Sequence, residues 1–209
     1  MKLYYIPQTS AFRPRWLLEE LGLPHELIRL TLSPKDTKSP EYLQVHPLGQ
    51  VPALLDDVEG PDGKSTRVTL IESAAICMYL AERDPARRFL PADSAPERAQ
   101  YYQWIFYAMD TLSPIVHTVY LRWFLAAPEA KATVATAADL EAVARVLAPV
   151  TKALAGKPFL LGEKFSVADV VMGGVLQWAN ASGLLVSCPE VCAYHARLSE
   201  RPAYKRALL

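Results

Sequence analysis

Every segment with the composition of a β-strand lies in the first 71 residues, and this distribution limits the possible folds more than any other feature of the chain. Four such segments alternate there with helical patterns, at residues 2–6, 25–32, 50–57 and 67–71. From residue 95 onward, apolar residues recur only with helical spacing. A βαβ unit followed by two strands and a helix predicts a small mixed four-stranded sheet with one antiparallel hairpin. We therefore expect an α+β domain followed by an all-helical domain.

The boundary between the two expected domains falls in the stretch 84–94, whose proline and charged residues are typical of a linker. The α+β domain then covers residues 1–83, and the helical domain covers residues 95–209. The long helical pattern that opens the second domain is expected to bend near Pro114. Residues 58–67 lengthen the hairpin between the third and fourth strands, and we expect them to form a solvent-exposed loop or to contact a second subunit.

The first helix is expected to begin close to Ala11, because Pro14 is tolerated only in the first turn of a helix. Gly22 suits the end of that helix, where a left-handed residue is common. The apolar residues between these limits share one face. Arg13 and Arg15 fall outside that face, so we expect both side chains to point away from the core.

The composition argues against several classes of partner. Lys plus Arg and Asp plus Glu each number 22, so the chain lacks the basic surplus of proteins that bind nucleic acid or anionic membranes. The three cysteines show neither metal-ligand spacing nor a disulfide framework, so we expect no metal and a reduced, cytoplasmic setting. No apolar run reaches membrane-spanning length, and the first residues do not have the pattern of a signal peptide.

Three short motifs follow one another along the chain: GQVPALL, ESAAICMYLAE and FSVADVVM, which begin at Gly49, Glu72 and Phe165. With them, the chain resembles the glutathione transferase family over nearly its whole length, and its N-terminal region is most similar to bacterial beta-class members. The resemblance implies a thioredoxin-like first domain, glutathione as co-substrate and a homodimer. In the third motif, Ser166 and Asp169 have the spacing of a helix capping box, so we expect Asp169 to be buried and structural.

The first two motifs imply a glutathione site. In the family, the proline of the first motif follows a cis peptide bond, and this proline is Pro52 here. The resemblance implies that the main chain of Val51, just before it, pairs with glutathione as an added strand would. Ser73 lies where a strand becomes a helix, and we expect it to be the N-cap residue at the positive end of the helix dipole. The resemblance implies that Ser73 binds the γ-glutamyl carboxylate and that Glu72 holds the α-amino end.

Two further residues are expected at this site. Gln50 offers an amide beside the same peptide, and Lys35 matches a lysine that beta-class members use near the glycine end of glutathione. For Lys35, a solvated loop lysine is an equal alternative.

Catalysis requires the thiolate of glutathione. An ordinary thiol has a pKa near 8.5, and one charge-assisted hydrogen bond at a helix start contributes about the 2–3 kcal/mol needed to lower it into the neutral range. Beta-class members carry a cysteine in place of Ser10 and a serine in place of Ala11, so this sequence departs from their pattern. Ser10 is the first expected donor and Tyr5 the second, although Ser10 could also be a simple helix cap. Without a cysteine at this position, a mixed disulfide with glutathione is disfavoured.

The resemblance places the second substrate against the first long helix of the helical domain. Tyr107, Asp110 and His117 share helical spacing there, and Ser113 aligns with a beta-class histidine that faces the site. We expect these four residues at the electrophile site, with core packing as the alternative for Tyr107 and His117.

The leading function is the transfer of reduced glutathione to small hydrophobic electrophiles, as in detoxification. One alternative keeps the cofactor for isomerisation, dehalogenation or peroxide reduction. The other is a binding module without useful turnover, which the alanine at position 11 favours.

Overall fold

A computed structural model describes residues 1–93 and 96–209. It divides into two compact units, one formed by residues 1–87 with 202–209 and the other by residues 88–201. The expected end of the linker at residue 94 and the expected start of the helical domain at residue 95 lie outside the described residues, so these domain limits stay predictions.

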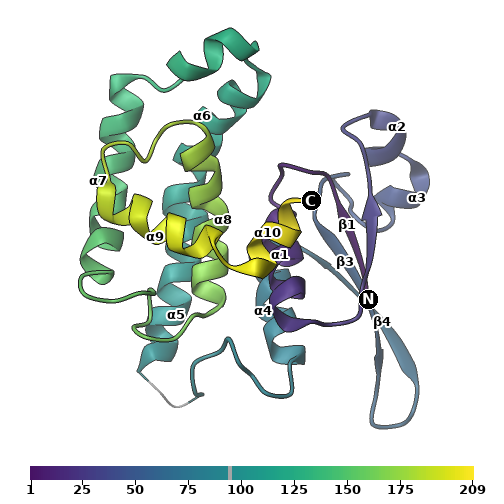
Figure 1. Cartoon of the computed structure of the whole chain (residues 1–209). Helices are drawn as coiled ribbons and strands as arrows, with labels where there is room; N and C mark the ends of the chain where they lie inside the picture. Colours follow the sequence, from purple (N-terminus) through teal and green to yellow (C-terminus); the bar gives the residue numbers. More distant parts are fainter. Residues whose placement is uncertain (94–95) are drawn as a thin grey trace. The chain divides into compact units, whose positions relative to one another are not determined.

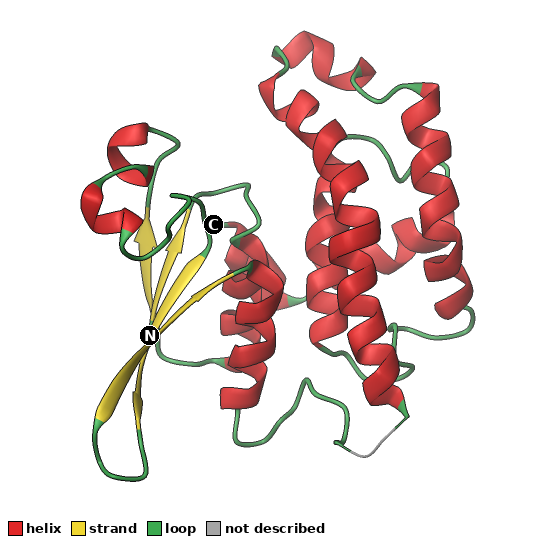
Figure 2. Cartoon of the chain, turned by 180° about the vertical axis from the view of Figure 1, so that it is seen from behind, coloured by secondary structure: helices red, strands yellow, loops and turns green. Residues whose placement is uncertain are grey.

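The first unit contains the only sheet of the described residues (Figures 1 and 2). Its strands, in the order β2-β1-β3-β4, are β1 (Lys2–Tyr5), β2 (Glu26–Arg29), β3 (Ala53–Glu59) and β4 (Ser65–Ile71). Strand β1 is parallel to β2 and antiparallel to β3, and β3 and β4 form an antiparallel hairpin. The expected mixed four-stranded sheet is confirmed.

The β3–β4 hairpin is regular to its tip, where Glu59 pairs with Ser65, and Figure 2 shows it extending past the other strands. Arg67 and Asp57 form an ion pair across the two strands, with Nε and Oδ1 2.7 Å apart. Half of the segment 58–67 that we expected to be a loop therefore belongs to the ladder, and the other five residues, 60–64, form the turn.

Five helices complete the first unit: α1 (Phe12–Leu21), α2 (Pro34–Thr37), α3 (Pro40–Leu43), α4 (Ser73–Arg83) and α10 (Pro202–Leu208). Helix α1 follows Ala11 and ends at Gly22, whose φ of 65° is the left-handed conformation expected there. Helices α1, α4 and α10 lie together beside the sheet in Figure 1. The centre of this core is fully buried and consists of Leu3, Trp16, Leu17, Leu54, Ile76 and Leu80.

The C-terminal helix α10 packs on the first helix, although the two are far apart in sequence. The Tyr204 ring meets the rings of Phe12 and Trp16 edge to face, at a centroid separation of 4.9 Å in both pairs. Arg206 Nε lies 2.6 Å from Glu19 Oε2 at the surface of the same contact. The last eight residues therefore complete the core of the first unit.

The regular elements of the second unit are all helices in its described residues, which also contain one isolated bridge between Phe159 and Gly162. Its longer helices are α5 (Glu97–Phe106), α6 (Ser113–Leu125), α7 (Ala137–Ala153), α8 (Val167–Ala181) and α9 (Pro189–Ser199). Helix α8 is apolar on almost every face, which is typical of a central helix that its neighbours surround. No helix of the described residues is both long and apolar enough to cross a membrane.

The long helical pattern is interrupted earlier than expected. A π-helical turn, Tyr107–Leu112, separates α5 from α6, and Pro114 then occupies the first turn of α6, where proline is tolerated. The interruption therefore precedes Pro114. A short 3₁₀ segment, Pro128–Thr133, follows α6.

The start of α8 confirms the expected capping box. Asp169 is fully buried and accepts hydrogen bonds from the main-chain N–H groups of Leu160 and Ser166, at 2.9 and 2.8 Å. The hydroxyl groups of Ser166 and Tyr194 donate to the same carboxylate, at 2.9 and 2.7 Å. Its role is structural, because every one of these bonds stays within the unit.

Candidate functional site

The peptide bond between Val51 and Pro52 is cis, as the resemblance implied. Strand β3 begins only at Ala53, so Val51 lies just outside the ladder, and its side chain is half-buried. Its carbonyl oxygen accepts a hydrogen bond from the Ser10 hydroxyl at 3.1 Å. Because a carbonyl oxygen has two lone pairs, Val51 retains the capacity to accept a second bond from an extended ligand.

The connection from β4 to α4 is one residue long. Glu72 occupies it with φ 70° and ψ 111°, an uncommon conformation for a residue with a side chain. Glu72 is therefore the N-cap residue of α4 and Ser73 is the first helical residue, so our assignment of Ser73 as the N-cap was wrong by one position. The Glu72 side chain is exposed and, within the described residues, makes no hydrogen bond to the helix start. The first N–H groups of α4 are thus available to a ligand.

Sequence reasoning missed the partner of Ser73. Arg13, on α1, is only 1% exposed, and its Nη1 donates to Ser73 Oγ at 2.8 Å. Arg15 is also buried, at 8% exposure, with its guanidinium 4.4 Å from the centroid of the Tyr5 ring. The expectation that both arginines point away from the core was wrong. The helical pattern alone could not show this, because their partners lie on a strand and on a helix 60 residues further along the chain.

The charge of Arg13 is retained in this buried position. Burial lowers the pKa of its guanidinium to about 10, while the nearby Cys77 and Glu72 oppose that change. Burial raises the pKa of the Cys77 thiol to about 12, so this cysteine is neutral at physiological pH. A buried cation therefore lies against the hydroxyl group at the start of α4.

The two expected thiolate donors lie near the start of α1. The Ser10 side chain is half-buried, and its hydroxyl bonds to Val51 rather than capping the helix, whose N-cap residue is Ala11. The simple cap that we considered for Ser10 is therefore wrong. Tyr5 faces α1 under Arg15, whereas the neighbouring Tyr4 packs against Tyr42 of α3, with ring centroids 5.3 Å apart.

Lys35 and Gln50 both lie near Tyr42. Lys35, on α2, borders a hollow of about 260 Å³ that Tyr4, Ser39 and Tyr42 also line. Gln50 has an exposed side chain, and its main-chain carbonyl accepts a hydrogen bond from the Tyr42 hydroxyl at 2.5 Å. Gln50 directly precedes Val51, whereas nothing in the described contacts joins Lys35 to Val51 or to Ser73.

The four expected electrophile residues have different environments in the helical unit. The Tyr107 hydroxyl donates to the Val146 carbonyl at 2.9 Å, and Ser113 is buried. Asp110 and His117 are exposed, and the His117 ring lies 5.4 Å from the ring of Trp178. The π-helical turn explains the difference, since its wider turn changes the phase between residues before and after it.

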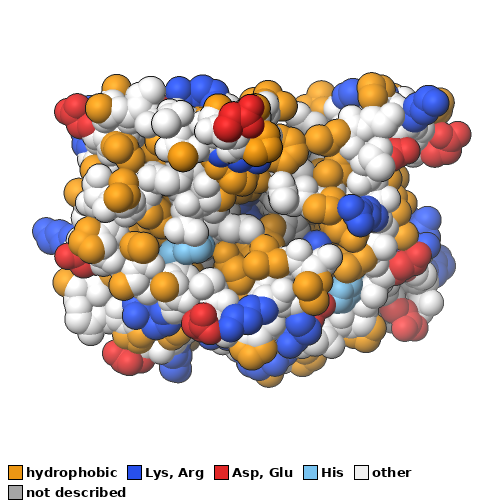
Figure 3. All heavy atoms as spheres, turned by 45° about the horizontal axis from the view of Figure 1, so that its top comes forward, with side chains coloured by type: hydrophobic (Ala, Val, Ile, Leu, Met, Phe, Trp, Pro, Cys, Tyr) orange, Lys and Arg blue, Asp and Glu red, His pale blue; other side chains and the backbone are white. Residues whose placement is uncertain are grey.

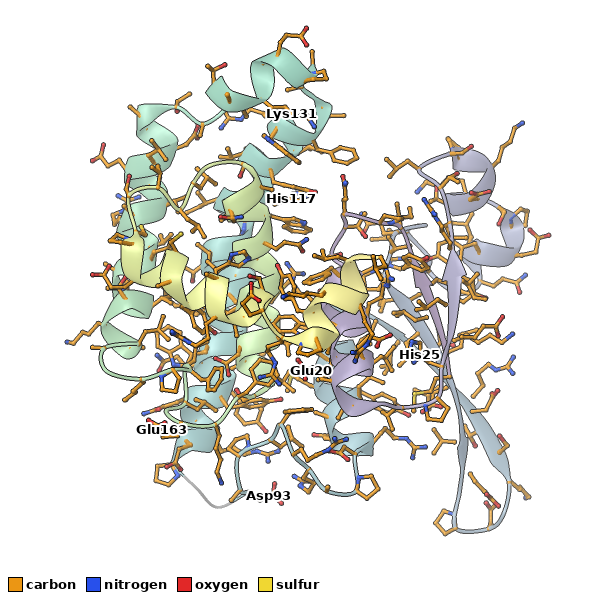
Figure 4. All side chains as sticks on the ribbon, viewed as in Figure 1. Glu20, His25, Asp93, His117, Lys131 and Glu163 are labelled. Carbon is orange, nitrogen blue, oxygen red and sulfur yellow. The ribbon has the colours of Figure 1, made fainter. Side chains whose placement is uncertain are left out.

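An aromatic stack continues from His117 along this part of the unit. Tyr120 stacks between Trp123 and Trp178, at centroid separations of 5.5 and 5.1 Å, and Lys131 lies 4.1 Å over the Trp123 ring. Figure 4 shows His117 on α6 and Lys131 on the short helix that follows. The aromatic side chains of this part of the unit are therefore in contact with each other.

The surface shown in Figure 3 carries basic and acidic side chains that are interspersed rather than sorted by sign. Among the described residues, no group of three or more His, Cys, Asp or Glu side chains is placed to hold a metal ion.

Comparison with known proteins identifies the family. Residues 1–82 match the model of the glutathione S-transferase N-terminal domain, and residues 108–202 match that of the C-terminal domain. The disulfide-bond oxidoreductase YfcG of Escherichia coli K12 is 31% identical over 210 aligned residues, which cover 99% of this chain and 94% of YfcG. Glutathione S-transferase GstA of E. coli O157:H7 is also 31% identical, and the alignment covers 100% of this chain and 97% of GstA.

Solved structures agree with this assignment. A sphingomonad glutathione S-transferase complexed with glutathione is 29% identical, with a TM-score of 0.74 over 100% of this chain and 97% of that one. A bacterial beta-class enzyme from Sphingomonas chungbukensis is 28% identical, with the same TM-score and the same coverage. The matches to both domain models and to the bacterial relatives show that this chain belongs to the glutathione S-transferase family.

Proposed function

We propose that this protein conjugates reduced glutathione to small hydrophobic electrophiles, and that it does so as a cytoplasmic homodimer. The observation that carries the proposal is the pair of features in the first unit: the Val51 main chain outside the ladder and the open start of α4. The first suits the backbone of an extended peptide, and the second suits a carboxylate. Glutathione offers both groups.

In the proposed complex, the cysteinyl part of glutathione pairs with the main chain of Val51, next to Pro52. The γ-glutamyl carboxylate lies at Ser73 and the first N–H groups of α4, and the exposed carboxylate of Glu72 holds the α-amino group. The Gln50 amide, which is also exposed, contacts the same peptide. Lys35 is proposed for the glycine carboxylate.

The thiolate is stabilised by Ser10 in this proposal. Its hydroxyl, which donates to Val51 in the structure, turns about the Cα–Cβ bond to donate to the sulfur. A hydrogen bond to a charged group contributes about 1.5–3 kcal/mol, which is of the size needed to lower a thiol pKa by roughly two units. Tyr5 is the second candidate, because its ring is held against Arg15 at the same end of α1.

The electrophile is proposed to contact the second unit through Asp110 and His117, which are exposed, and through Tyr107 and Ser113, which also pack within the unit. Replacing His117 with alanine is expected to raise the KM for the electrophile and to leave glutathione affinity unchanged. An unchanged KM for the electrophile together with a lower affinity for glutathione would show that His117 does not contact the electrophile.

Glutathione-dependent peroxide reduction is the second candidate, and the similarity to the oxidoreductase YfcG favours it. In that reaction two glutathione molecules are oxidised to the disulfide, while the peroxide is reduced to an alcohol and water, so no protein cysteine is required. Two of the three cysteines suit a redox role poorly, since Cys77 and Cys188 are buried and burial raises both pKa values, whereas Cys192 is exposed.

Calorimetric titration with reduced glutathione, on the wild type and on Ser73→Ala, tests the proposal. We expect saturable binding that the substitution weakens. Turnover with 1-chloro-2,4-dinitrobenzene and with cumene hydroperoxide then separates conjugation from peroxide reduction. Binding without turnover of either compound would indicate a non-catalytic binding module. Absence of binding at millimolar glutathione would contradict all three functions.

A further inference from the structure

The contact between Arg13 and Ser73 gives the proposed glutathione site a component that the motifs do not contain. Arg13 comes from α1, is 1% exposed, and donates to Ser73 Oγ at 2.8 Å. Ser73 itself is 3% exposed and is the first residue of α4. The hydrogen bond joins two buried side chains that lie 60 residues apart in the sequence.

The chemistry of the two groups fixes the direction of this bond. A guanidinium group has five N–H donors and no acceptor, whereas a serine hydroxyl has one donor and two acceptor lone pairs. Arg13 must therefore occupy a lone pair of Ser73 Oγ, and the Ser73 proton cannot be directed back to Arg13. The hydroxyl is left as a donor toward another acceptor. Because its oxygen is polarised by a cation, it is also a stronger donor.

The charges around Ser73 favour an anionic acceptor. The start of α4 contributes the positive end of a helix dipole, and its first N–H groups have no partner within the helix. Arg13 adds a full positive charge in a place from which water is largely excluded, where charges interact more strongly than in water. The neighbouring Cys77 is a neutral thiol and does not offset this charge, whereas the Glu72 carboxylate, which is exposed to water, offsets it in part.

We propose that Arg13 is a positioning residue for the γ-glutamyl end of glutathione: it holds the Ser73 hydroxyl as a donor to the α-carboxylate, and its charge strengthens that interaction. The inference rests on the proposed function. If Arg13 only held α1 against α4, its replacement would lower the stability of the protein and would weaken ligands with and without the carboxylate equally. The two roles are separable by experiment.

The experiment compares two ligands by calorimetry: reduced glutathione and γ-aminobutyryl-cysteinyl-glycine, which lacks only the α-carboxylate. We expect Arg13→Met to weaken the binding of glutathione about tenfold, equivalent to about 1.4 kcal/mol, and to leave the binding of the analogue unchanged. Arg13→Lys, which keeps the charge, is expected to restore part of the selectivity. Arg15→Met is the matched control, because it removes a second buried arginine of α1 that contacts Tyr5 and not Ser73.

A double-mutant cycle tests the route of the effect. If Arg13 acts through Ser73, then Arg13→Met in the Ser73→Ala background should change glutathione affinity by clearly less than tenfold. Equal weakening of both ligands by Arg13→Met, or no weakening of either, would overturn the inference while leaving the proposed function intact. Failure of the wild type to bind glutathione would instead overturn the proposed function. Should Arg13→Met not fold, the selectivity of Arg13→Lys decides the question.

Discussion

The starts of α8 and α4 both hold buried polar side chains, and they differ in charge and in how completely those side chains are bonded. At the start of α8, the Asp169 carboxylate accepts from two main-chain N–H groups and two hydroxyls. At the start of α4, the buried charge is the guanidinium of Arg13, and Ser73 accepts from it. The first arrangement supplies its own anion, whereas the second presents donors and positive charge.

Because of this difference, of the two helix starts only that of α4 is suited to an anionic ligand. A helix start with a carboxylate in place satisfies its own N–H groups and has no use for an anionic ligand. A helix start that is backed by a cation favours an anion from outside the chain. The nature of the buried side chain, rather than the presence of a helix start, therefore indicates which end of which helix receives the ligand.

Replacement of Asp169 with alanine should produce the largest effect. It removes the acceptor of four buried hydrogen bonds and leaves main-chain and side-chain donors without a partner. We expect the free energy of unfolding to fall by about 4 kcal/mol, since each unsatisfied buried donor costs about 1–3 kcal/mol. Urea-induced unfolding followed by circular dichroism measures this change. A loss below 1 kcal/mol would contradict the structural role of Asp169.

Much of the fold was predictable from the sequence because its signals are local. The strand segments, the helix start at Ala11 and the capping box of Asp169 each depend on residues within a few positions of one another. The cis bond before Pro52 followed from the family resemblance. The motifs also predicted the two main-chain segments of the proposed site, at Val51 and at the start of α4.

The parts that were missed depend on partners distant in sequence or on the phase of a helix. Arg13 looked like a surface residue, since only the folded chain brings it to Ser73. The packing of Tyr204 on α1 joins the two ends of the chain, which no helical pattern reveals. The π-helical turn at residues 107–112 lengthens a helix turn locally, so an uninterrupted α-helical spacing does not give the relative orientation of residues before and after it.

Replacement of Tyr204 with alanine is expected to have the second largest effect, and it tests whether α1 must be held in place for the α4 site to work. The ring contacts Phe12 and Trp16 and is 3% exposed. Loss of a buried aromatic side chain costs about 3–5 kcal/mol, so we expect a loss of about 3 kcal/mol in unfolding experiments. Glutathione affinity should fall as well, because α1 carries Arg13.

The matched control is Leu208→Ala, which alters a side chain of α10 that is half exposed. It should change stability by less than about 0.5 kcal/mol, as is usual for a surface substitution. If Tyr204→Ala lowered stability but left glutathione affinity unchanged, the position of α1 would not depend on α10.

His195, next to Tyr194 on α9, should make the second unit sensitive to acid. Burial lowers the pKa of His195 from 6.5 to about 4, so the unfolded chain binds the proton at a higher pH than the folded chain does. The stability contributed by the neutral side chain is present above about pH 6.5 and is lost as the pH falls toward 4. At pH 5 the loss is about 2 kcal/mol, at 1.36 kcal/mol per pH unit.

The measurement is the free energy of unfolding of the wild type and of His195→Gln between pH 7.5 and pH 5. The difference between the two proteins should shrink or reverse as the pH falls, because the variant has no imidazole to protonate. Parallel curves over this range would show that the imidazole takes up its proton equally in both states.

The smallest expected effect is at the start of α7, which sharpens the comparison because it also carries a capping box but is less buried than the start of α8. At the start of α7, the Asp139 carboxylate accepts from the N–H and hydroxyl of Thr136 and pairs with Arg122, with 20% of its side chain exposed. Partial burial opposes ionisation, but these bonds together lower the pKa of Asp139 below its usual value. The stabilisation is therefore present above about pH 4 and is lost as the pH falls further.

We expect Asp139→Ala to cost about 1 kcal/mol at pH 7 in the same urea experiment, as is typical for a helix cap that water can replace. A cost as large as that of Asp169→Ala would mean that burial is not what distinguishes the two capping boxes, and the contrast drawn between helix starts would lose its physical basis.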